Sequence, residues 1–121
     1  MPPVLLIDDD PDIRVLVEMA LRLHDIDTIA CSQGMEGLKA LETSIFSLVI
    51  LDVMMPDMSG YEVLHTIATR FGTQAPPVAV FSARPPDALA RELHGLPVAC
   101  ILPKPFEPDK LATIVEALIR K

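Results

Sequence analysis

Residues 4–11 read VLLIDDDP, and this stretch predicts how the rest of the chain is built. Its four apolar residues are typical of a strand that is buried on both faces of a parallel sheet. Asp10 is a good N-cap and Pro11 suits the first position of a helix, so we expect a helix to follow directly. The stretch therefore predicts a strand that leads into a helix, with carboxylates at the junction.

The same alternation of apolar runs and helix-like segments continues along the chain. Four further runs lie at residues 27–30, 48–51, 78–81 and 99–102. Five strands that alternate with five helices predict a (βα)5 unit with right-handed crossovers. For 121 residues we expect an α/β, doubly wound, flavodoxin-like sandwich whose parallel five-stranded sheet has the order 2-1-3-4-5. Pro103 cannot donate to a sheet ladder, which places the fifth strand at an edge.

Glycine and proline residues mark where the later helices begin and end. Gly72 predicts the end of the third helix. Asp87 follows Pro85-Pro86 and is expected to cap a fourth helix over residues 87–94. This fourth segment is short.

Length and composition indicate a single domain over residues 1–121. Hydrophobic residues make up 50% and charged residues 22%, which is too apolar for a disordered chain. Because the sequence has neither a membrane-spanning apolar run nor a signal-peptide pattern, we expect a cytoplasmic protein with no membrane partner. Cys31 and Cys100 lack metal-binding or redox spacing and are interpreted as small buried apolar residues.

Negative charge is concentrated in the first half of the chain. The net charge is −7, with a balance of −9 over residues 1–62 and +2 over residues 63–121. We therefore expect no basic surface for binding nucleic acid. A cation, or a ligand that carries one, suits this acidic half better.

Polar side chains stand where the predicted strands end. They are Asp8, Asp9, Asp10, Asp52, Ser82 and Lys104. Ligands of an open parallel sheet bind at the carboxyl ends of the strands, so these groups are expected at one rim. Clustered carboxylates need a proton or a cation to offset their repulsion, and hard oxygen ligands suit Mg²⁺. Since a lysine and a hydroxyl bind phosphoryl oxygens well, phosphoryl transfer is the predicted chemistry.

Other chemistries lack their usual residues at this rim. The sequence places no His/Ser or His/Cys pair there for acyl transfer, no glycine-rich nucleotide loop and no His/Cys zinc cluster. A flavodoxin-like electron carrier would share the fold. Its flavin phosphate, however, would be repelled by the acidic loop after the first strand.

Four segments, taken in order, resemble the receiver domain of two-component response regulators. They are the acidic pair Asp8-Asp9, the segment LDVMMPDMSG at residues 51–60, the turn Phe81-Ser82-Ala83 and the sequence Lys104-Pro105-Phe106. The resemblance extends over essentially the whole chain. It implies a phosphoryl-accepting signalling domain of a phosphorelay. Such a domain would catalyse only its own phosphorylation and dephosphorylation and would not be an enzyme that acts on a separate substrate.

The resemblance also implies roles for individual residues. Asp52 would accept the phosphoryl group. Asp9, Asp52 and the backbone carbonyl of Met54 would ligate Mg²⁺, and Asp8 would assist through a coordinated water. Lys104 would bridge to Asp52 at rest and to a phosphoryl oxygen afterwards.

Ser82 would turn to hydrogen-bond the phosphoryl group and so change the surface of the fourth helix and the fifth strand. An aromatic residue often stands three positions before the lysine in the family, where this chain has Ile101. The side chains of Met54 and Arg84 would border the mouth of the pocket and affect how fast water attacks the phosphorylated aspartate. The Lys104-Pro105 peptide is commonly cis in the family.

The implied phosphoryl donor is a sensor histidine kinase or a histidine phosphotransfer protein. An effector domain beyond Lys121, or a separate effector protein, would respond to the signal. The alternative is a pseudo-receiver, which has the same fold and acts as a constitutive protein-interaction module. The intact set of Asp8, Asp9, Asp52, Ser82 and Lys104 argues against that alternative.

Overall fold

Five parallel strands form a sheet in the order β2-β1-β3-β4-β5, as predicted. The computed structural model describes residues 1–55 and 58–120, so Pro56 and Asp57 of the segment at 51–60 lie outside the described residues, as does Lys121. The strands are β1 (Val4–Ile7), β2 (Thr28–Cys31), β3 (Leu48–Asp52), β4 (Val78–Ser82) and β5 (Cys100–Pro103). Pro103 ends the edge strand β5, which confirms the predicted edge position.

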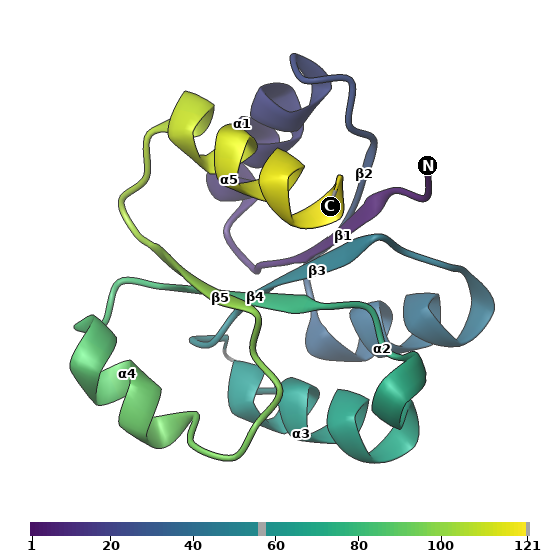
Figure 1. The fold of residues 1–121 in the computed structure, drawn as a ribbon, viewed down its shortest axis with the longest axis vertical. Coiled ribbons are helices and arrows are strands. Elements are labelled where there is room, and N and C mark those ends of the chain that lie inside the picture. Colours follow the sequence, from purple (N-terminus) through teal and green to yellow (C-terminus); the bar gives the residue numbers. More distant parts are fainter. Residues whose placement is uncertain (56–57, 121) are drawn as a thin grey trace.

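Helices cover both faces of the sheet (Figure 1). They are α1 (Pro11–Arg22), α2 (Gly34–Thr43), α3 (Gly60–Arg70), α4 (Pro86–Glu92) and α5 (Pro108–Ile119). α1 and α5 lie on one face, and α2, α3 and α4 lie on the other. This arrangement confirms the predicted α/β, doubly wound, flavodoxin-like fold.

The sheet divides the apolar core in two because alternate residues of a strand face opposite sides. In β3, Leu48 and Ile50 pack with α1 and α5, whereas Val49 and Leu51 pack with α2, α3 and α4. All four side chains are fully buried. Burial of each contributes about 1.5–3 kcal/mol to folding. The two-sided core therefore holds the strand ends, and the polar residues on them, in a fixed register.

Local signals set several helix boundaries as predicted. Asp10 caps α1, because its side chain accepts a hydrogen bond from the N–H of Asp12, and Pro11 takes the first helical position. Ser59, which was not predicted as a cap, also caps α3: its hydroxyl accepts a hydrogen bond from the N–H of Glu62. Gly72 follows α3 with a φ of 57°, a left-handed conformation that glycine adopts without strain.

The predicted N-cap of the fourth helix is wrong by two residues. α4 begins at Pro86, Pro85 occupies the N-cap position, and Asp87 lies in the first turn without capping the helix. The reason is that the first helical position needs no backbone N–H, so a proline is favoured there. The helix also ends at Glu92, earlier than expected.

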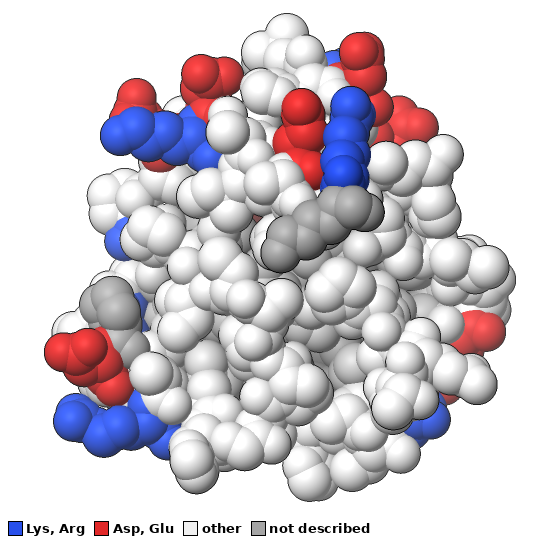
Figure 2. All heavy atoms as spheres, viewed as in Figure 1, with Lys and Arg blue, Asp and Glu red and all other residues white. Residues whose placement is uncertain are grey.

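Cys31 is buried at the end of β2, and Cys100 is half-buried in β5. Burial raises the pKa of the Cys31 thiol, so that side chain stays neutral and packs as an apolar group. Across residues 1–55 and 58–120, every helix is too short or too polar to cross a membrane. On the face seen in Figure 2, charged side chains of both signs stand around the edge, over α1 and α5, over α4, and on the side of α2 and α3, and most of the centre is uncharged.

Candidate functional site

The polar residues predicted at the strand ends lie together at the carboxyl edge of the sheet. Asp8 directly follows β1, Asp52 and Ser82 are the last residues of β3 and β4, and Lys104 follows β5. Backbone hydrogen bonds continue past the strands. The N–H of Asp8 donates to the carbonyl oxygen of Cys31 (3.1 Å), and the N–H of Lys104 donates to that of Ser82 (2.9 Å). The side chains of Asp8 and Lys104 therefore leave the sheet from fixed positions.

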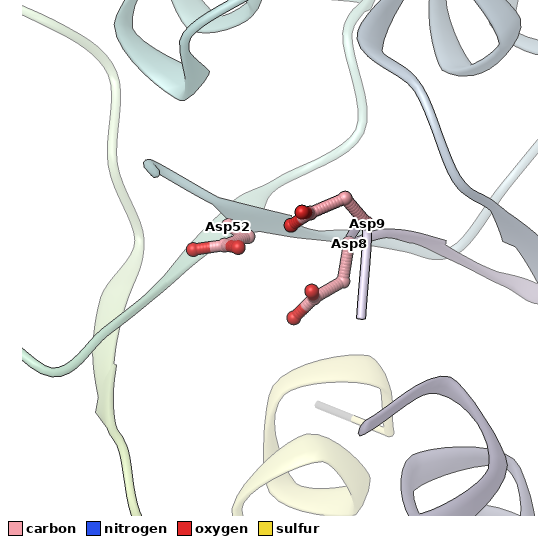
Figure 3. A group of neighbouring side chains, drawn as sticks. All are labelled: Asp8, Asp9 and Asp52. Carbon is pink, nitrogen blue, oxygen red and sulfur yellow. The ribbon is translucent and has the colours of Figure 1, made fainter. Parts of the chain in front are cut away.

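Three carboxylates form the centre of the site. Oxygen atoms of Asp8, Asp9 and Asp52 lie within 4.8 Å of one another, and the Asp9 side chain reaches toward Asp52 (Figure 3). Asp8 is fully buried, Asp52 is 4% exposed, and Asp9 is open to solvent. Negative charges at this separation repel one another, so the group needs a proton or a positive charge nearby.

Asp8 already has a hydrogen-bond partner for each side-chain oxygen. Oδ1 accepts from the N–H of Asp10 and Oδ2 accepts from Nζ of Lys104, both at 2.9 Å. The Arg14 guanidinium donates to the carbonyl oxygen of Asp8, also at 2.9 Å. A buried carboxylate is stable only when it is paired in this way. Both side-chain oxygens of Asp8 thus already accept hydrogen bonds from protein groups, whereas Asp9 presents its oxygens to solvent.

Asp52 is held less tightly than Asp8. Its Oδ1 accepts a hydrogen bond from the N–H of Met54 at 3.1 Å, and its Oδ2 lies 3.4 Å from Nζ of Lys104. Burial, and then the negative charge of Asp8, raise the pKa of Asp52 to about 6, although the Met54 N–H and Lys104 act against this shift. A carboxyl group with a pKa so near neutrality is a good candidate for a functional residue.

Lys104 supplies the positive charge between Asp8 and Asp52. Its side chain is 19% exposed. Burial lowers the pKa of Lys104, but the hydrogen bond to Asp8 and the negative charges of Asp52 and Asp8 outweigh that effect and raise the pKa above its ordinary value. Lys104 is therefore a permanent cation at neutral pH. The Lys104-Pro105 peptide is cis, as expected from the resemblance.

Ser82 is buried, and its hydroxyl faces the loop that follows β4. Oγ of Ser82 accepts a hydrogen bond from the N–H of Arg84 at 3.0 Å. A hollow beside the site is lined by Ser82, Arg84, Ile101 and Lys104, among others. Ile101, the position without an aromatic ring, therefore borders the region around Ser82. Met54, expected at the mouth of the pocket, is 63% exposed.

Two partners of the site were not predicted from the sequence. The first is Arg14 in α1, whose guanidinium donates to the carbonyl oxygen of Asp8, six positions earlier. Helical spacing pairs side chains three or four positions apart, so it does not indicate this contact. The second is Phe81, whose ring centre lies 4.8 Å from Nζ of Lys104 in a cation–π arrangement. No local pattern reveals this contact, because it depends on how β4 and β5 pair.

The comparisons with known proteins agree with this geometry. The sequence model of the response regulator receiver domain matches residues 4–116. The chain belongs to the response regulator receiver domain family. Receiver domains are signalling domains of two-component systems rather than classical enzymes.

Named relatives of this receiver domain include two transcriptional regulatory proteins. A CpxR homolog from Haemophilus influenzae is 36% identical over 123 residues, which cover 100% of this chain and 52% of the relative. The probable regulator TcrX from Mycobacterium tuberculosis is 32% identical over 120 residues, 98% of this chain and 50% of the relative. The receiver domain thus spans about half the length of these relatives.

Solved structures share the fold of this receiver domain over nearly its full length. The signal receiver domain of a putative LuxO repressor protein from Vibrio parahaemolyticus has a TM-score of 0.88 at 28% identity, covering 98% of this chain and 90% of that chain. The response regulator TrrA from Thermotoga maritima was solved in complex with Mg²⁺-BeF. It has a TM-score of 0.81 at 28% identity, and the match covers 98% of this chain and 99% of that chain.

The donor set of the receiver domain fits a small divalent cation. Carboxylate oxygens are the hard ligands that Mg²⁺ prefers, and Mg²⁺ usually takes one or two carboxylates and keeps waters elsewhere. Asp9 and Asp52 could serve as these two, because Asp9 is exposed and Asp52 lies beside it. A cation here would offset the repulsion among the three carboxylates.

Proposed function

We propose that this receiver domain accepts a phosphoryl group on Asp52 from a phosphohistidine of a sensor histidine kinase or a histidine phosphotransfer protein. One observation carries the proposal: the Asp52 carboxylate lies at the carboxyl edge of the sheet, 3.4 Å from the Lys104 ammonium and within 4.8 Å of the exposed Asp9. Phosphoryl transfer depends mainly on positioning and on neutralising charge. This arrangement supplies both.

The transfer would exchange a P–N bond for a P–O bond. A carboxylate oxygen of Asp52 attacks phosphorus while the bond from phosphorus to the imidazole nitrogen breaks. The nitrogen leaves with the electron pair and takes up a proton, and Asp52 becomes an acyl phosphate. Later attack of water on phosphorus releases inorganic phosphate and restores the carboxylate. The domain would thus catalyse its own phosphorylation and dephosphorylation.

Asp9, Asp52 and the backbone carbonyl of Met54 would hold Mg²⁺, with Asp8 acting through a coordinated water. Both side-chain oxygens of Asp8 already accept hydrogen bonds from the protein, which supports an indirect role for this residue. The Mg²⁺-BeF complex of the related TrrA protein supports the choice of metal. When bound, Mg²⁺ would offset the negative charge that gathers between the carboxylate and the phosphoryl group.

Lys104 and Ser82 would respond to the modification. Lys104 lies between Asp8 and Asp52, so a small movement would bring its ammonium to a phosphoryl oxygen. Ser82 would turn its hydroxyl from the Arg84 N–H toward the phosphoryl group and so change the surface of α4 and β5. With Ile101 in the adjoining hollow, this change would proceed without an aromatic side chain.

Residues 1–121 would act as one receiver domain in the cytoplasm and would signal to an effector. The relatives, about twice as long, are transcriptional regulatory proteins, which supports an effector domain or an effector protein as the partner. The pseudo-receiver alternative has less support, because the acidic group, Ser82 and Lys104 are all present and gathered at one rim.

A mass measurement on the intact protein tests the function. Incubation with Mg²⁺ and acetyl phosphate should add one phosphoryl group to the wild type and none to Asp52→Asn. Asp12→Asn, at an exposed position in the first turn of α1, is the matched control and should label like the wild type. Equal labelling of Asp52→Asn, or no added mass on the wild type, would contradict the proposal.

A further inference from the structure

A cluster of polar side chains outside the acidic site joins three segments of the chain. Its members are Tyr61 near the start of α3, Arg84 in the loop after β4, and Glu92 at the end of α4. Both terminal nitrogens of Arg84 bind the Glu92 carboxylate, at 2.5 and 2.6 Å. The Tyr61 hydroxyl donates to Glu92 and accepts from Nη1 of Arg84 at 3.3 Å. The last residue of α4 is therefore tied both to α3 and to the loop.

Arg84 also contacts the site, through its main chain. Its N–H donates to Oγ of Ser82 at 3.0 Å, and Ser82 is only 3% exposed. One residue thus holds Ser82 with its backbone and α4 with its side chain. If the Ser82 side chain rotates away, the N–H of Arg84 loses its acceptor. Ile101, which lines the same hollow, is aliphatic and has no polar group to relay such a change.

We propose that Tyr61, Arg84 and Glu92 form a latch that holds α4 to α3 in the unphosphorylated domain and opens when Ser82 turns toward a phosphoryl group on Asp52. This inference rests on the function proposed above. Arg84 is a positioning residue here, since it acts through Ser82 and not on the phosphoryl group. Once its N–H is released, the loop shifts, the guanidinium leaves Glu92, and the Tyr61 hydroxyl is freed.

The strength of the latch suits a reversible switch. The side chains of Arg84 and Glu92 are 39% and 34% exposed. Ion pairs at such exposure shift an opening equilibrium by roughly fivefold, and the bidentate geometry increases this effect. α4 has only seven residues, so it depends on contacts of this kind for its position.

Tyr61 makes the latch observable. It is the only tyrosine in a chain without tryptophan, so ultraviolet emission reports on this one side chain. A phenol bonded to a carboxylate emits weakly, because the carboxylate attracts the phenolic proton. Burial, and then the contact with Glu92, raise the pKa of Tyr61, while Arg84 opposes this. Opening of the latch should therefore increase the emission.

The test combines Tyr61 emission with the intact mass during incubation with Mg²⁺ and acetyl phosphate. In the wild type, emission should rise in proportion to the fraction of molecules that carry the phosphoryl group. Glu92→Gln should emit strongly from the start, gain the same mass, and show no further rise. Its phenol should also titrate at lower pH than that of the wild type in a spectrophotometric titration.

Glu42→Gln is the matched control. Glu42 pairs with Arg70 at 2.5 Å between α2 and α3, at a similar exposure, so its loss should leave the emission response unchanged. Added mass without a rise in wild-type emission would overturn the latch and leave the proposed function standing. A wild-type protein that gains no mass would overturn both. If the emission of Glu92→Gln rises on phosphorylation as much as that of the wild type, the latch alone is overturned.

Discussion

Nζ of Lys104 lies 2.9 Å from Oδ2 of Asp8, closer than the 3.4 Å that separates it from Oδ2 of Asp52. The resemblance implied a resting contact with Asp52, and the structure adds the tighter contact with Asp8. The physical reason is burial: Asp8 is fully buried, and a charge-assisted hydrogen bond is worth most to a group that water does not reach. The hydrogen bond to Asp8 thus holds the Lys104 ammonium beside Asp52, while its contact with Asp52 is longer and weaker.

Removal of this cation should destabilise the fold. Lys104→Ala leaves Asp8 and Asp52 without their shared counter-charge, and we expect a loss of about 2 kcal/mol in the free energy of unfolding at pH 7 without divalent cations. Added Mg²⁺ should recover part of the loss. Lys110→Ala is the control, because Lys110 and Glu107 form an exposed pair, and it should change stability by less than about 0.5 kcal/mol. Urea unfolding measures both variants, and equal losses would contradict the role given to Lys104.

Ionised Asp52 should cost stability. Its pKa is about 6 in the folded protein and 3.8 ordinarily, so the folded state binds more protons between these values. The free energy of unfolding should therefore fall as pH rises from about 4 to about 6. Asp52→Asn should remove this dependence and stabilise the protein at pH 7 by about 1 to 2 kcal/mol, which allows for screening by solvent and Lys104. Urea unfolding from pH 4 to 8, with Asp12→Asn as control, checks this. A destabilised Asp52→Asn would contradict it.

His24 should also make the free energy of unfolding fall as pH rises, but in a higher pH range than Asp52. Its ring nitrogens lie 3.0 Å from Glu116 and 3.3 Å from Asp109 of α5. These two hydrogen bonds, first that of Glu116, raise the pKa of His24 above 6.5. Protonated His24 then stabilises the docking of α5 below pH 6.5, and this contribution is lost as pH rises through the folded pKa. His24→Gln should abolish this decrease in stability, measured as the midpoint of thermal unfolding from pH 6 to 9. The exposed His65→Gln should retain it, and if both variants behave alike the assignment to His24 is wrong.

Gly60 should tolerate no side chain. A Cβ there would lie 2.4 Å from the carbonyl oxygen of Asp52 and 2.4 Å from Cα of Val53, both backbone atoms next to the acceptor. Gly60→Ala should therefore cost about 2 kcal/mol or more and distort the loop after β3. A Cβ at Gly72 would meet no atom of the described residues within 4 Å, so Gly72→Ala should cost only the strain of its left-handed φ, about 1 kcal/mol. Thermal unfolding of both compares the effects, and an equal cost would argue against close packing at Gly60.

The fold could be predicted from sequence because its signals are local. The apolar run at 4–7 with Asp10 and Pro11 directly behind it defines one strand and the start of one helix, and the pattern repeats along the chain. Pro103 indicated the edge strand through its missing N–H. The cap of α4 was mispredicted because Pro86 and Asp87 both suit a helix N-terminus, and only the backbone conformation shows which of them begins the helix.

The sequence by itself determined which groups meet at the carboxyl edge, because in a parallel sheet the residue that ends each strand must emerge on the same side. Only the tertiary structure decided how those groups pair. Lys104 bonds Asp8, 96 positions away in the chain, and Glu92 is shared by Arg84 and Tyr61 across two helices. Such choices depend on burial and on the direction of side chains from separate elements, which no local pattern of residues encodes.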